Sequence, residues 1–454
     1  MPESSGVAMP ASKPRTFHVT TMGCQMNLAD SENLARRLLA AGYAQESDLD
    51  RADIAVLNTC VVRQASEDKV YSKLGELGRW KAPGRTIALT GCLVKKEGDR
   101  LKSRFPQLDA VIPIGQYDDF LADLEARYDY ALGEPLPAAG RTAVSHYINV
   151  IQGCDHNCTF CIVPAVRGRE VHVPMDQVLS ACRAAVRDGA REVVLLGQNV
   201  DDYRDPDGGG GLASLVRRVS AIDGLRRVRF MTSHPQDLEP ELLEVMASND
   251  KVAHELQLPV QSGDDTVLRR MARGYQVRHY RAIVERAREL MPEIGLYTDV
   301  IVGFPGESEE MYLNTRRLIE EIQFDVVHLA QYSPRPGTHS AEKWSDDVSA
   351  DDKRRRINDL LTLQRGIAAA RSQRWLGREV EVLVEGFDEL GRPYGRSRQG
   401  KRVVIKGRRS VGSGEQGGDE QSDAQLSRGG DMVIVGVDSS SAGQLSGPVV
   451  RKGG

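Results

Sequence analysis

Residues 151–169 read I-Q-G-C-D-H-N-C-T-F-C-I-V-P-A-V-R-G-R and place Cys154, Cys158 and Cys161 in a C-x3-C-x2-C run directly after an apolar segment. Three thiolates this close on a short loop can bind three irons of a [4Fe–4S] cluster, which usually has four cysteine ligands. The fourth iron then keeps an open position for a substrate or cosubstrate. A zinc site, which favours paired C-x2-C units, and buried free thiols are the alternatives.

The composition of the whole chain limits the class of protein. A length of 454 residues predicts two or three domains, and 40% hydrophobic and 27% charged residues are typical of a globular protein. The chain has 7 cysteines, an odd number, and its start lacks a secretory pattern, which disfavours a disulfide framework. It also lacks an apolar run of the ~18 residues that a membrane helix needs, so we expect a cytoplasmic protein without a membrane partner.

Three strand-like segments in the first third of the chain each lead into a cysteine. They are residues 17–22 before Cys24, residues 54–59 before Cys60 and residues 86–90 before Cys92. Helical patterns at residues 30–42 and 66–79 follow the first two segments, so one strand–helix unit separates successive cysteines. Because parallel strands end at one edge of a sheet, the three cysteines should converge there. This arrangement predicts an open α/β domain with a second cluster; three separate buried thiols are the alternative.

Six further strand-like runs with helical patterns between them predict a partial (βα)6 barrel in the middle of the chain. The runs are residues 146–152, 192–196, 227–232, 252–260, 296–302 and 326–331. Chemistry in such barrels lies at the carboxyl ends of the strands, where the cysteine run also falls. Cys182 lies in a helical pattern at residues 178–188, and we interpret it as a packing residue.

The last hundred residues combine a basic segment with strand patterns. Residues 353–409 contain 16 Lys and Arg against 6 Asp and Glu, in a chain of net charge −4. This local excess suits contact with phosphates, although a solvated helix face is the alternative for residues 353–356. Strand patterns at residues 379–384, 391–398, 402–405 and 432–435 predict a small β-barrel. Residues 407–430 are rich in Gly, Ser, Gln and Asp, which predicts a disordered insertion.

Several motifs in these segments resemble those of a known family. The C-x3-C-x2-C run with Phe160 between its last two cysteines resembles the radical S-adenosylmethionine (SAM) superfamily. The N-terminal motifs resemble the methylthiotransferases, and the finer pattern is similar to the MiaB-type tRNA methylthiotransferases from about residue 16 to residue 437. The motifs are Gly23-Cys24-Gln25-Met26-Asn27, Asn58-Thr59-Cys60, Gly91-Cys92, Gly197-Gln198-Asn199-Val200 and Arg335-Pro336-Gly337. The C-terminal strands resemble a TRAM domain, a small RNA-binding β-barrel.

The resemblance implies a domain order and a set of site residues. An N-terminal methylthiotransferase domain at residues 15–134 would follow a disordered tail at residues 1–14, with the radical SAM core at residues 140–372 and the TRAM domain at residues 373–454. Cys154, Cys158 and Cys161 would bind the catalytic [4Fe–4S] cluster, whose open iron binds SAM. Cys24, Cys60 and Cys92 would bind an auxiliary [4Fe–4S] cluster. The resemblance further implies SAM contacts by Phe160, Gln198, Gln261, Ile301 and Val302.

The resemblance also implies an activity and partners. The enzyme would methylthiolate C2 of N6-(dimethylallyl)adenosine next to the anticodon of tRNA, using SAM both as radical source and as methyl donor. The adenine would be splayed out of the anticodon stem-loop, as single-stranded bases in RNA loops allow. The partners would be tRNA, an external one-electron donor and the iron–sulfur assembly machinery, and the enzyme would act as a monomer. A radical enzyme acting on a protein or on another modified adenosine, and a non-catalytic zinc-bound RNA module, are the alternatives.

Overall fold

The computed structural model describes residues 15–61, 64–98, 100–128, 144–406 and 428–453. The chain forms two compact units, Met1–Arg141 and Thr142–Gly454. The expected tail at residues 1–14 and residues 407–427 of the expected insertion lie outside the described residues, as does the expected boundary between residues 134 and 140. Over the described residues, no helix is both long enough and apolar enough to cross a membrane.

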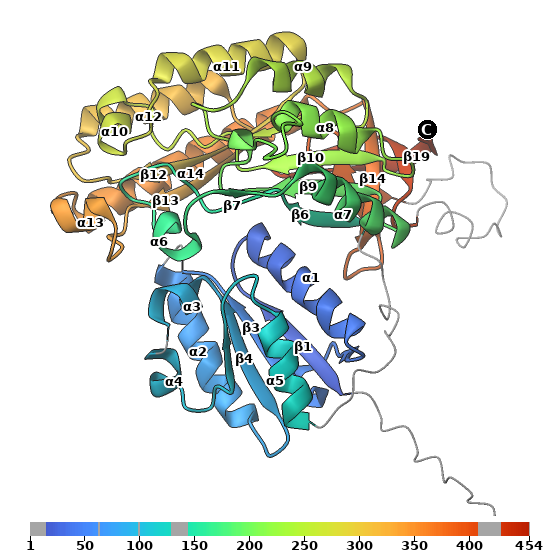
Figure 1. Ribbon diagram of the computed structural model, residues 1–454. Coiled ribbons are helices and arrows are strands. Elements are labelled where there is room, and N and C mark those ends of the chain that lie inside the picture. The colour runs from blue at the N-terminus through green and yellow to red at the C-terminus, as the bar shows by residue number, and fades with distance from the viewer. Residues whose placement is uncertain (1–14, 62–63, 99, 129–143, 407–427, 454) are drawn as a thin grey trace, which may run out of the picture. The chain divides into compact units, whose positions relative to one another are not determined.

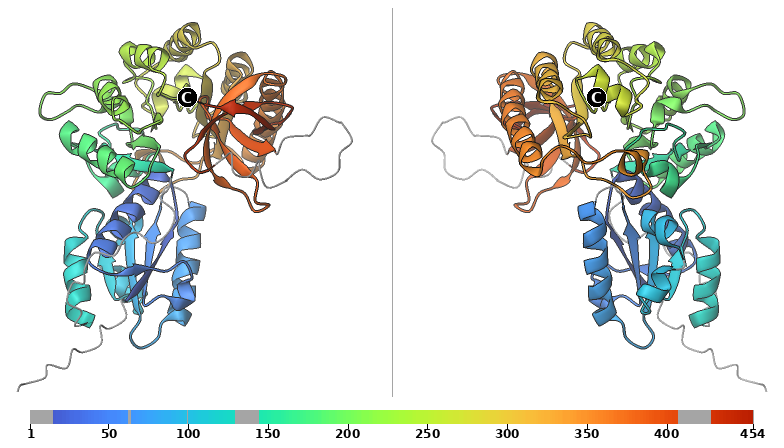
Figure 2. Two further views of the ribbon diagram at one scale, coloured as in Figure 1. Left: turned by 90° about the vertical axis from the view of Figure 1, so that its right-hand side faces the viewer. Right: turned by 90° about the vertical axis from the view of Figure 1, so that its left-hand side faces the viewer.

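A parallel sheet with the strand order β2-β1-β3-β4-β5 forms the centre of the first unit. Its strands are β1 (Thr16–Thr21), β2 (Ala44–Gln45), β3 (Ile54–Thr59), β4 (Thr86–Gly91) and β5 (Ala110–Ile112). Figure 2 shows helices on both faces of this sheet: α1 (Gln25–Ala40) and α5 (Asp118–Tyr128) on one face, α2 (Gln64–Trp80) on the other. The strand order reverses between β1 and β3, and open α/β sheets bind ligands at the carboxyl ends of the strands beside such a reversal.

The first helix begins earlier than its sequence suggested. The helical pattern was expected from residue 30, but α1 begins at Gln25 with Cys24 in the N-cap position. Asp30 and Ser31 are instead buried inside the helix, where the Ser31 hydroxyl accepts hydrogen bonds from Thr21 and Asn58. These tertiary hydrogen bonds use the polar groups that usually favour a capping position.

The second unit contains the expected partial barrel, drawn in green to orange in Figure 1. Six parallel strands form it in two sheets, β10-β9-β6 and β11-β12-β13, and a bridge between Val228 and Val252 links them. The strands are β6 (Ser145–Asn149), β9 (Glu192–Leu196), β10 (Arg227–Met231), β11 (Glu255–Gln257), β12 (Gly295–Val302) and β13 (Val326–Gln331). The helices that follow them in the chain are α7 (Met175–Arg187), α8 (Leu212–Ser220), α9 (Pro240–Ser248), α11 (Val277–Leu290), α12 (Glu309–Ile322) and α14 (Ala350–Gln373). Cys182 is fully buried in the core of this barrel, which confirms its packing role.

A small closed β-barrel follows α14, as the C-terminal strand patterns predicted. Five strands close it in the order β16-β15-β14-β17-β19, with β19 pairing back to β16, and β18 pairs with β19. They are β14 (Glu379–Phe387), β15 (Pro393–Ser397), β16 (Arg402–Lys406), β17 (Met432–Gly436), β18 (Ser439–Ser441) and β19 (Gln444–Lys452). The closing strand β19 was not predicted, because its sequence contains Gly447-Pro448 and lacks a regular apolar alternation. The mixed α/β class with this terminal barrel confirms the predicted fold.

The β15–β16 hairpin docks against the amino ends of the barrel strands. The backbone oxygens of residues 396, 398 and 399 accept hydrogen bonds from the Arg227 side chain (2.7 Å), the His254 N–H (2.8 Å) and the Tyr297 hydroxyl (3.2 Å). This contact leaves the opposite, carboxyl ends of the strands to the loops that carry the cysteine run.

A buried ion-pair network ties this hairpin to the barrel. The carboxylate of Asp325, with 2% of its side chain exposed, accepts from Lys401 Nζ at 2.6 Å and from Arg371 Nε and Nη2 at 3.0 and 2.9 Å. Asp325→Ala would leave both cations buried without their counter-charge, so we expect a loss of about 3–5 kcal/mol in the free energy of unfolding. Urea unfolding of the full chain, followed by circular dichroism, measures this loss.

Asp250→Ala is the matched control for that substitution. Asp250 also pairs with a hairpin cation, Arg398, but at 3.7 Å and with a fully exposed carboxylate. Exposed pairs contribute about 0–1 kcal/mol, so the control should unfold close to wild type. Equal unfolding midpoints for the two variants would contradict the role assigned to Asp325.

Candidate functional site

The cysteine run lies on a tightly closed loop after the first barrel strand. β7 (Ile151–Gln152) pairs with β8 (Val171–His172), and the Cys154 N–H donates to the Gly168 carbonyl at 3.2 Å. Gly153 has a φ of +82°, and a Cβ at this position would lie 2.1 Å from the Arg169 carbonyl oxygen. Only glycine fits this approach, so the loop brings its two ends together immediately before Cys154.

The three thiols of this loop are half-buried and free of disulfides. Burial raises the pKa of Cys154 to about 12 and that of Cys161 to about 11, so without metal both thiols are neutral at pH 7. The Cys161 sulfur accepts a hydrogen bond from the Val163 N–H at 3.4 Å, and the Cys158 sulfur accepts one from the Arg273 guanidinium at 3.2 Å. A bound metal must displace the thiol protons, and these donors then face the thiolates.

In the first unit, the cysteines follow three neighbouring strands. Cys24 comes after β1, Cys60 directly after β3 and Cys92 directly after β4, and the strand order reverses between the first two. A Cβ on Gly23 would lie 2.5 Å from Cys60 Cβ, so the backbone before Cys24 passes directly over Cys60. Cys24 is exposed, whereas Cys60 and Cys92 are buried. One edge of one sheet therefore carries all three.

A buried amide network fixes the loops that carry Cys24 and Cys60. Asn27 Nδ2 donates to Asn58 Oδ1 and to the Thr59 carbonyl, both at 3.0 Å, and Asn58 Nδ2 donates to the Asn27 carbonyl at 2.8 Å. Both asparagines are fully buried. The Cys24 thiol lies 3.3 Å from Asn27 Oδ1, so the same side chain orients the first cysteine.

Neither cysteine triplet gathers its sulfurs as closely as the ligands of a single ion would be gathered. Among the described residues, the set of three possible ligand side chains whose ligand atoms lie within 4.8 Å of one another is His156, His234 and Asp237, and neither cysteine triplet forms such a set. Zinc, with Zn–S bonds of about 2.3 Å, needs its sulfurs roughly 4 Å apart. A [4Fe–4S] cube binds each cysteine to a different iron and holds the sulfurs farther apart. Neither cysteine triplet is therefore arranged as a preformed site for a single zinc ion.

His156, His234 and Asp237 connect the cysteine loop to the loop after β10. The two imidazole rings stack with centroids 4.1 Å apart and planes 14° from parallel. An ion in the plane of one ring would lie out of the plane of the other, so this set does not converge on a metal. The Asp237 carboxylate lies 2.6 Å from His156 Nε2 and accepts from Asn199 Nδ2 at 2.7 Å.

The two histidines have pKa values shifted in opposite directions. The hydrogen bond to Asp237 raises the pKa of His156, whereas burial, with the charge of Arg273, lowers the pKa of His234 to about 2. His234 is therefore neutral and contributes packing to the loop. Asp237 was not identified from the sequence, although its place three residues after His234 beyond a barrel strand was a usable signal.

The residues expected to contact SAM lie at the carboxyl ends of the strands. Gln198 is half-buried, and its Oε1 accepts from the Gly153 N–H at 2.6 Å, beside Cys154. Gln261 adopts a φ of +66°, a strained conformation for a residue with a side chain, and its backbone bridges to Val300. Thr232, after β10, has a φ of +74° and was not predicted as a site residue. Strained backbone is often found at functional sites, and both of these positions lie in loops at the carboxyl ends of barrel strands.

Phe160 and Ile301 pack against one aromatic cluster, whereas Val302 does not. Phe160 contacts Phe304 edge to face at 6.3 Å between centroids, and Ile301 packs against the same group. Val302 is fully buried in the main barrel core, because successive side chains of a strand point to opposite faces. A contact between Val302 and adenine would therefore have to come from its backbone.

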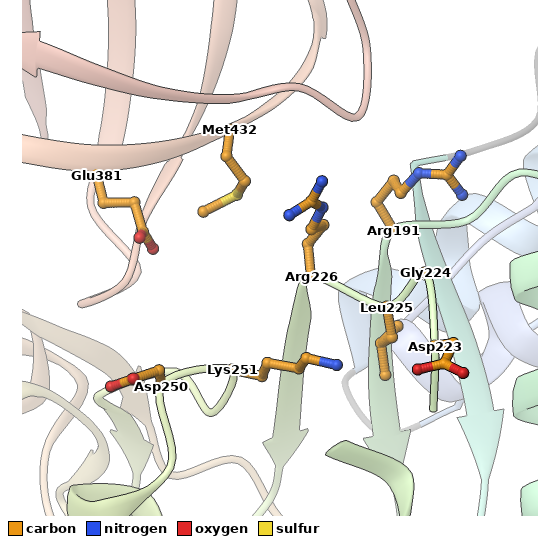
Figure 3. Close-up of a pocket in the computed structure, with 9 residues that line it drawn as sticks. All are labelled: Arg191, Asp223, Gly224, Leu225, Arg226, Asp250, Lys251, Glu381 and Met432. Atoms are coloured by element: carbon orange, nitrogen blue, oxygen red, sulfur yellow. The ribbon is translucent and has the colours of Figure 1, made fainter. Parts of the chain in front are cut away.

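A separate pocket of about 550 Å³ lies at the other end of the barrel, next to β14 and β17 (Figure 3). Its barrel residues precede strands β9, β10 and β11, so they lie at the amino ends of the strands, away from the cysteine loop. Its charged lining consists of Arg191, Arg226 and Lys251 against Asp223, Asp250 and Glu381. This balance of charges gives no net attraction for phosphate, and we assign the pocket no catalytic role.

Comparison with known structures and family models supports the fold. Residues 148–319 match the radical SAM superfamily, and residues 16–113 match the uncharacterized protein family UPF0004. The solved structure of the radical SAM methyltransferase TsrM from Kitasatospora setae, with cobalamin and a [4Fe-4S] cluster bound, aligns with a TM-score of 0.53 at 12% identity. The alignment covers 72% of this chain and 74% of that one, and it concerns the fold alone. The protein is a radical SAM enzyme and uses SAM and an iron–sulfur cluster.

Curated relatives define the family more closely. The tRNA-2-methylthio-N(6)-dimethylallyladenosine synthase of Thermotoga petrophila is 38% identical over 403 residues, 86% of this chain and 91% of the relative. Enzymes of the same name from Roseiflexus sp. (strain RS-1) and Syntrophotalea carbinolica are 41% and 40% identical, over 87% and 83% of this chain and 84% and 90% of theirs. The chain belongs to the MiaB-type family of radical SAM methylthiotransferases, which confirms the resemblance identified from its sequence.

Proposed function

We propose that this enzyme is a tRNA-2-methylthio-N6-dimethylallyladenosine synthase, which places a methylthio group on C2 of N6-(dimethylallyl)adenosine next to the anticodon. The similarity to synthases of this name, at 36–41% identity over about 86% of the chain, carries the proposal. Both cysteine triplets, one in each folded unit, support it.

The proposed enzyme would carry two [4Fe–4S] clusters, one in each unit. Cys154, Cys158 and Cys161 would hold the catalytic cluster, and Cys24, Cys60 and Cys92 would hold the auxiliary one. When bound, the clusters and SAM supply the electron, the radical, the sulfur and the methyl group of the reaction. The closed loop at Gly153 and the hydrogen bond from His156 to Asp237 hold the first triplet, and the Asn27–Asn58 network holds the loops of the second.

The protein groups around SAM follow from the positions at the barrel mouth. We assign Gln198 to the SAM amino group, Gln261 to the ribose hydroxyls, and the exposed part of Ile301 to adenine, with Phe160 packing beside the cluster. Gln198 and Gln261 are half-buried at strand ends, which leaves part of each side chain accessible to a ligand. The aromatic group around Phe304 gives Ile301 and Phe160 a rigid support.

Fewer cations of the basic segment are available for contact with phosphates than its composition suggested. Lys353 and Arg356 are buried, and they pair with Asp346 and with Glu307, the latter at 2.7 Å. Neither can reach a phosphate, so they hold α14 against the barrel instead. We propose that the TRAM barrel provides the main contact with the anticodon stem. The enzyme would act as a cytoplasmic monomer, reduced by an external one-electron donor and supplied by the iron–sulfur assembly machinery.

The mass of the nucleoside product tests the proposal. Enzyme reconstituted anaerobically with iron and sulfide is incubated with SAM, reductant and tRNA from a strain that lacks this modification. Digestion and mass spectrometry should then show N6-(dimethylallyl)adenosine in which one methylthio group has replaced one hydrogen. The same modification appearing instead on a protein or on another modified adenosine would contradict the substrate. A colourless protein that binds zinc and no iron would contradict the enzyme class.

A further inference from the structure

We propose that Arg273 is the buried counter-charge of the catalytic cluster, acting through Cys158 to raise the reduction potential of that cluster. The inference rests on the proposed role of Cys158 as a cluster ligand. Arg273 would be a positioning residue, because it acts through the ligand rather than on the substrate.

The position of Arg273 is fixed from several sides. It lies between α10 (Asp265–Arg270) and α11, and only 6% of it is exposed. Its Nη1 donates to Cys158 Sγ at 3.2 Å, its Nη2 to the Pro259 carbonyl at 3.1 Å, and its Nε lies 3.5 Å from the Tyr275 hydroxyl. The planar guanidinium is therefore held with one edge toward the cysteine loop.

The partners of this buried cation are otherwise neutral. Within the part of the chain that the structure describes, no carboxylate forms an ion pair with Arg273. The Pro259 carbonyl carries no charge, and burial raises the pKa of Tyr275, which keeps its phenol neutral. A buried guanidinium without an anion is costly, so a site of this kind is built for a negative partner. The Cys158 thiolate of a bound cluster is the group that Arg273 faces.

The same contact predicts an effect on electron transfer. Hydrogen bonds to the sulfur ligands and nearby positive charge stabilise the reduced, more negative state of an iron–sulfur cluster. The reduction adds one electron from the external donor and breaks no bond. Arg273 should therefore make the catalytic cluster easier to reduce.

A redox titration of the full chain tests this inference. Cys24, Cys60 and Cys92 are replaced by alanine so that only the catalytic cluster gives a signal, and its midpoint potential is followed by electron paramagnetic resonance. Arg273→Met should lower the reduced-to-oxidised ratio at a fixed potential about tenfold, equivalent to 59 mV for one electron. Arg273→Lys keeps the positive charge, so its cluster should have a midpoint potential closer to that of the protein with Arg273 intact.

Arg269→Met is the matched control, because Arg269 is an exposed arginine on the neighbouring helix α10. The midpoint potential of the catalytic cluster should be unchanged in the Arg269→Met variant. A wild-type potential in an iron-loaded Arg273→Met variant would overturn the inference. If Arg273→Met holds no cluster, retention by Arg273→Lys supports the counter-charge, and loss in both variants counts against it. Absence of iron with Arg273 intact would contradict the proposed function instead.

Discussion

Cys158→Ala should reduce the formation of 5′-deoxyadenosine from SAM to background, a fall of more than about 100-fold, while iron remains bound to the N-terminal unit. Loss of groups that only support a metal ligand typically costs 10–100-fold, and loss of the ligand itself should cost more. The N-terminal triplet lies in a separate compact unit, so its iron should not depend on Cys158. Chromatography of the SAM cleavage products and an iron assay on the same sample measure both effects.

Cys182→Ala is the control for this experiment. Cys182 is also a cysteine of the second unit, but it is buried in the core on α7, away from the strand ends. Its replacement should lower stability by about 1 kcal/mol and leave SAM cleavage intact. If Cys158→Ala cleaves SAM at the wild-type rate, the assignment of the catalytic cluster to this loop is wrong.

The sequence was sufficient to predict those parts of the fold and of the site that follow from one physical rule. Parallel strands end at one edge, and this rule predicted that the cysteines after β1, β3 and β4 lie at one edge of the sheet. The six barrel strands were found because mostly apolar runs of strand length recur with helical patterns between them. Strands β2 and β5, with two and three residues, are too short to produce a periodic signal and were missed.

The parts that could not be predicted depend on contacts between distant residues. Arg273 donates to Cys158 across 115 residues of sequence, and nothing in either segment indicates the contact. The basic segment is a similar case: its composition suggested phosphate binding, but Arg356 pairs with Glu307, which lies 49 residues away in sequence. Lys353 is buried beside Asp346, a nearby residue whose pairing the composition did not indicate. A local charge excess therefore predicts an RNA surface only for side chains that remain exposed.

Cys60→Ala should separate the two halves of the reaction: SAM cleavage should persist, and methylthiolated tRNA should fall more than about 100-fold. Cys60 follows the central β3, between the strands that carry Cys24 and Cys92, so its removal takes away the middle ligand of the proposed auxiliary cluster. The catalytic loop lies in the other compact unit and keeps its three thiols.

Both products should be measured in one anaerobic reaction, with 5′-deoxyadenosine reporting cleavage and the digested nucleosides reporting thiolation. Cys24→Ala and Cys92→Ala should likewise retain SAM cleavage and lose methylthiolation, since each removes one of the three ligands of the same proposed cluster. Val61→Ala, a truncation of the buried residue next to Cys60, controls for local packing and should retain methylthiolation. Normal methylthiolation by Cys60→Ala would exclude an auxiliary cluster at this sheet edge. Loss of cleavage together with thiolation would show instead that the first unit is needed for the radical step itself.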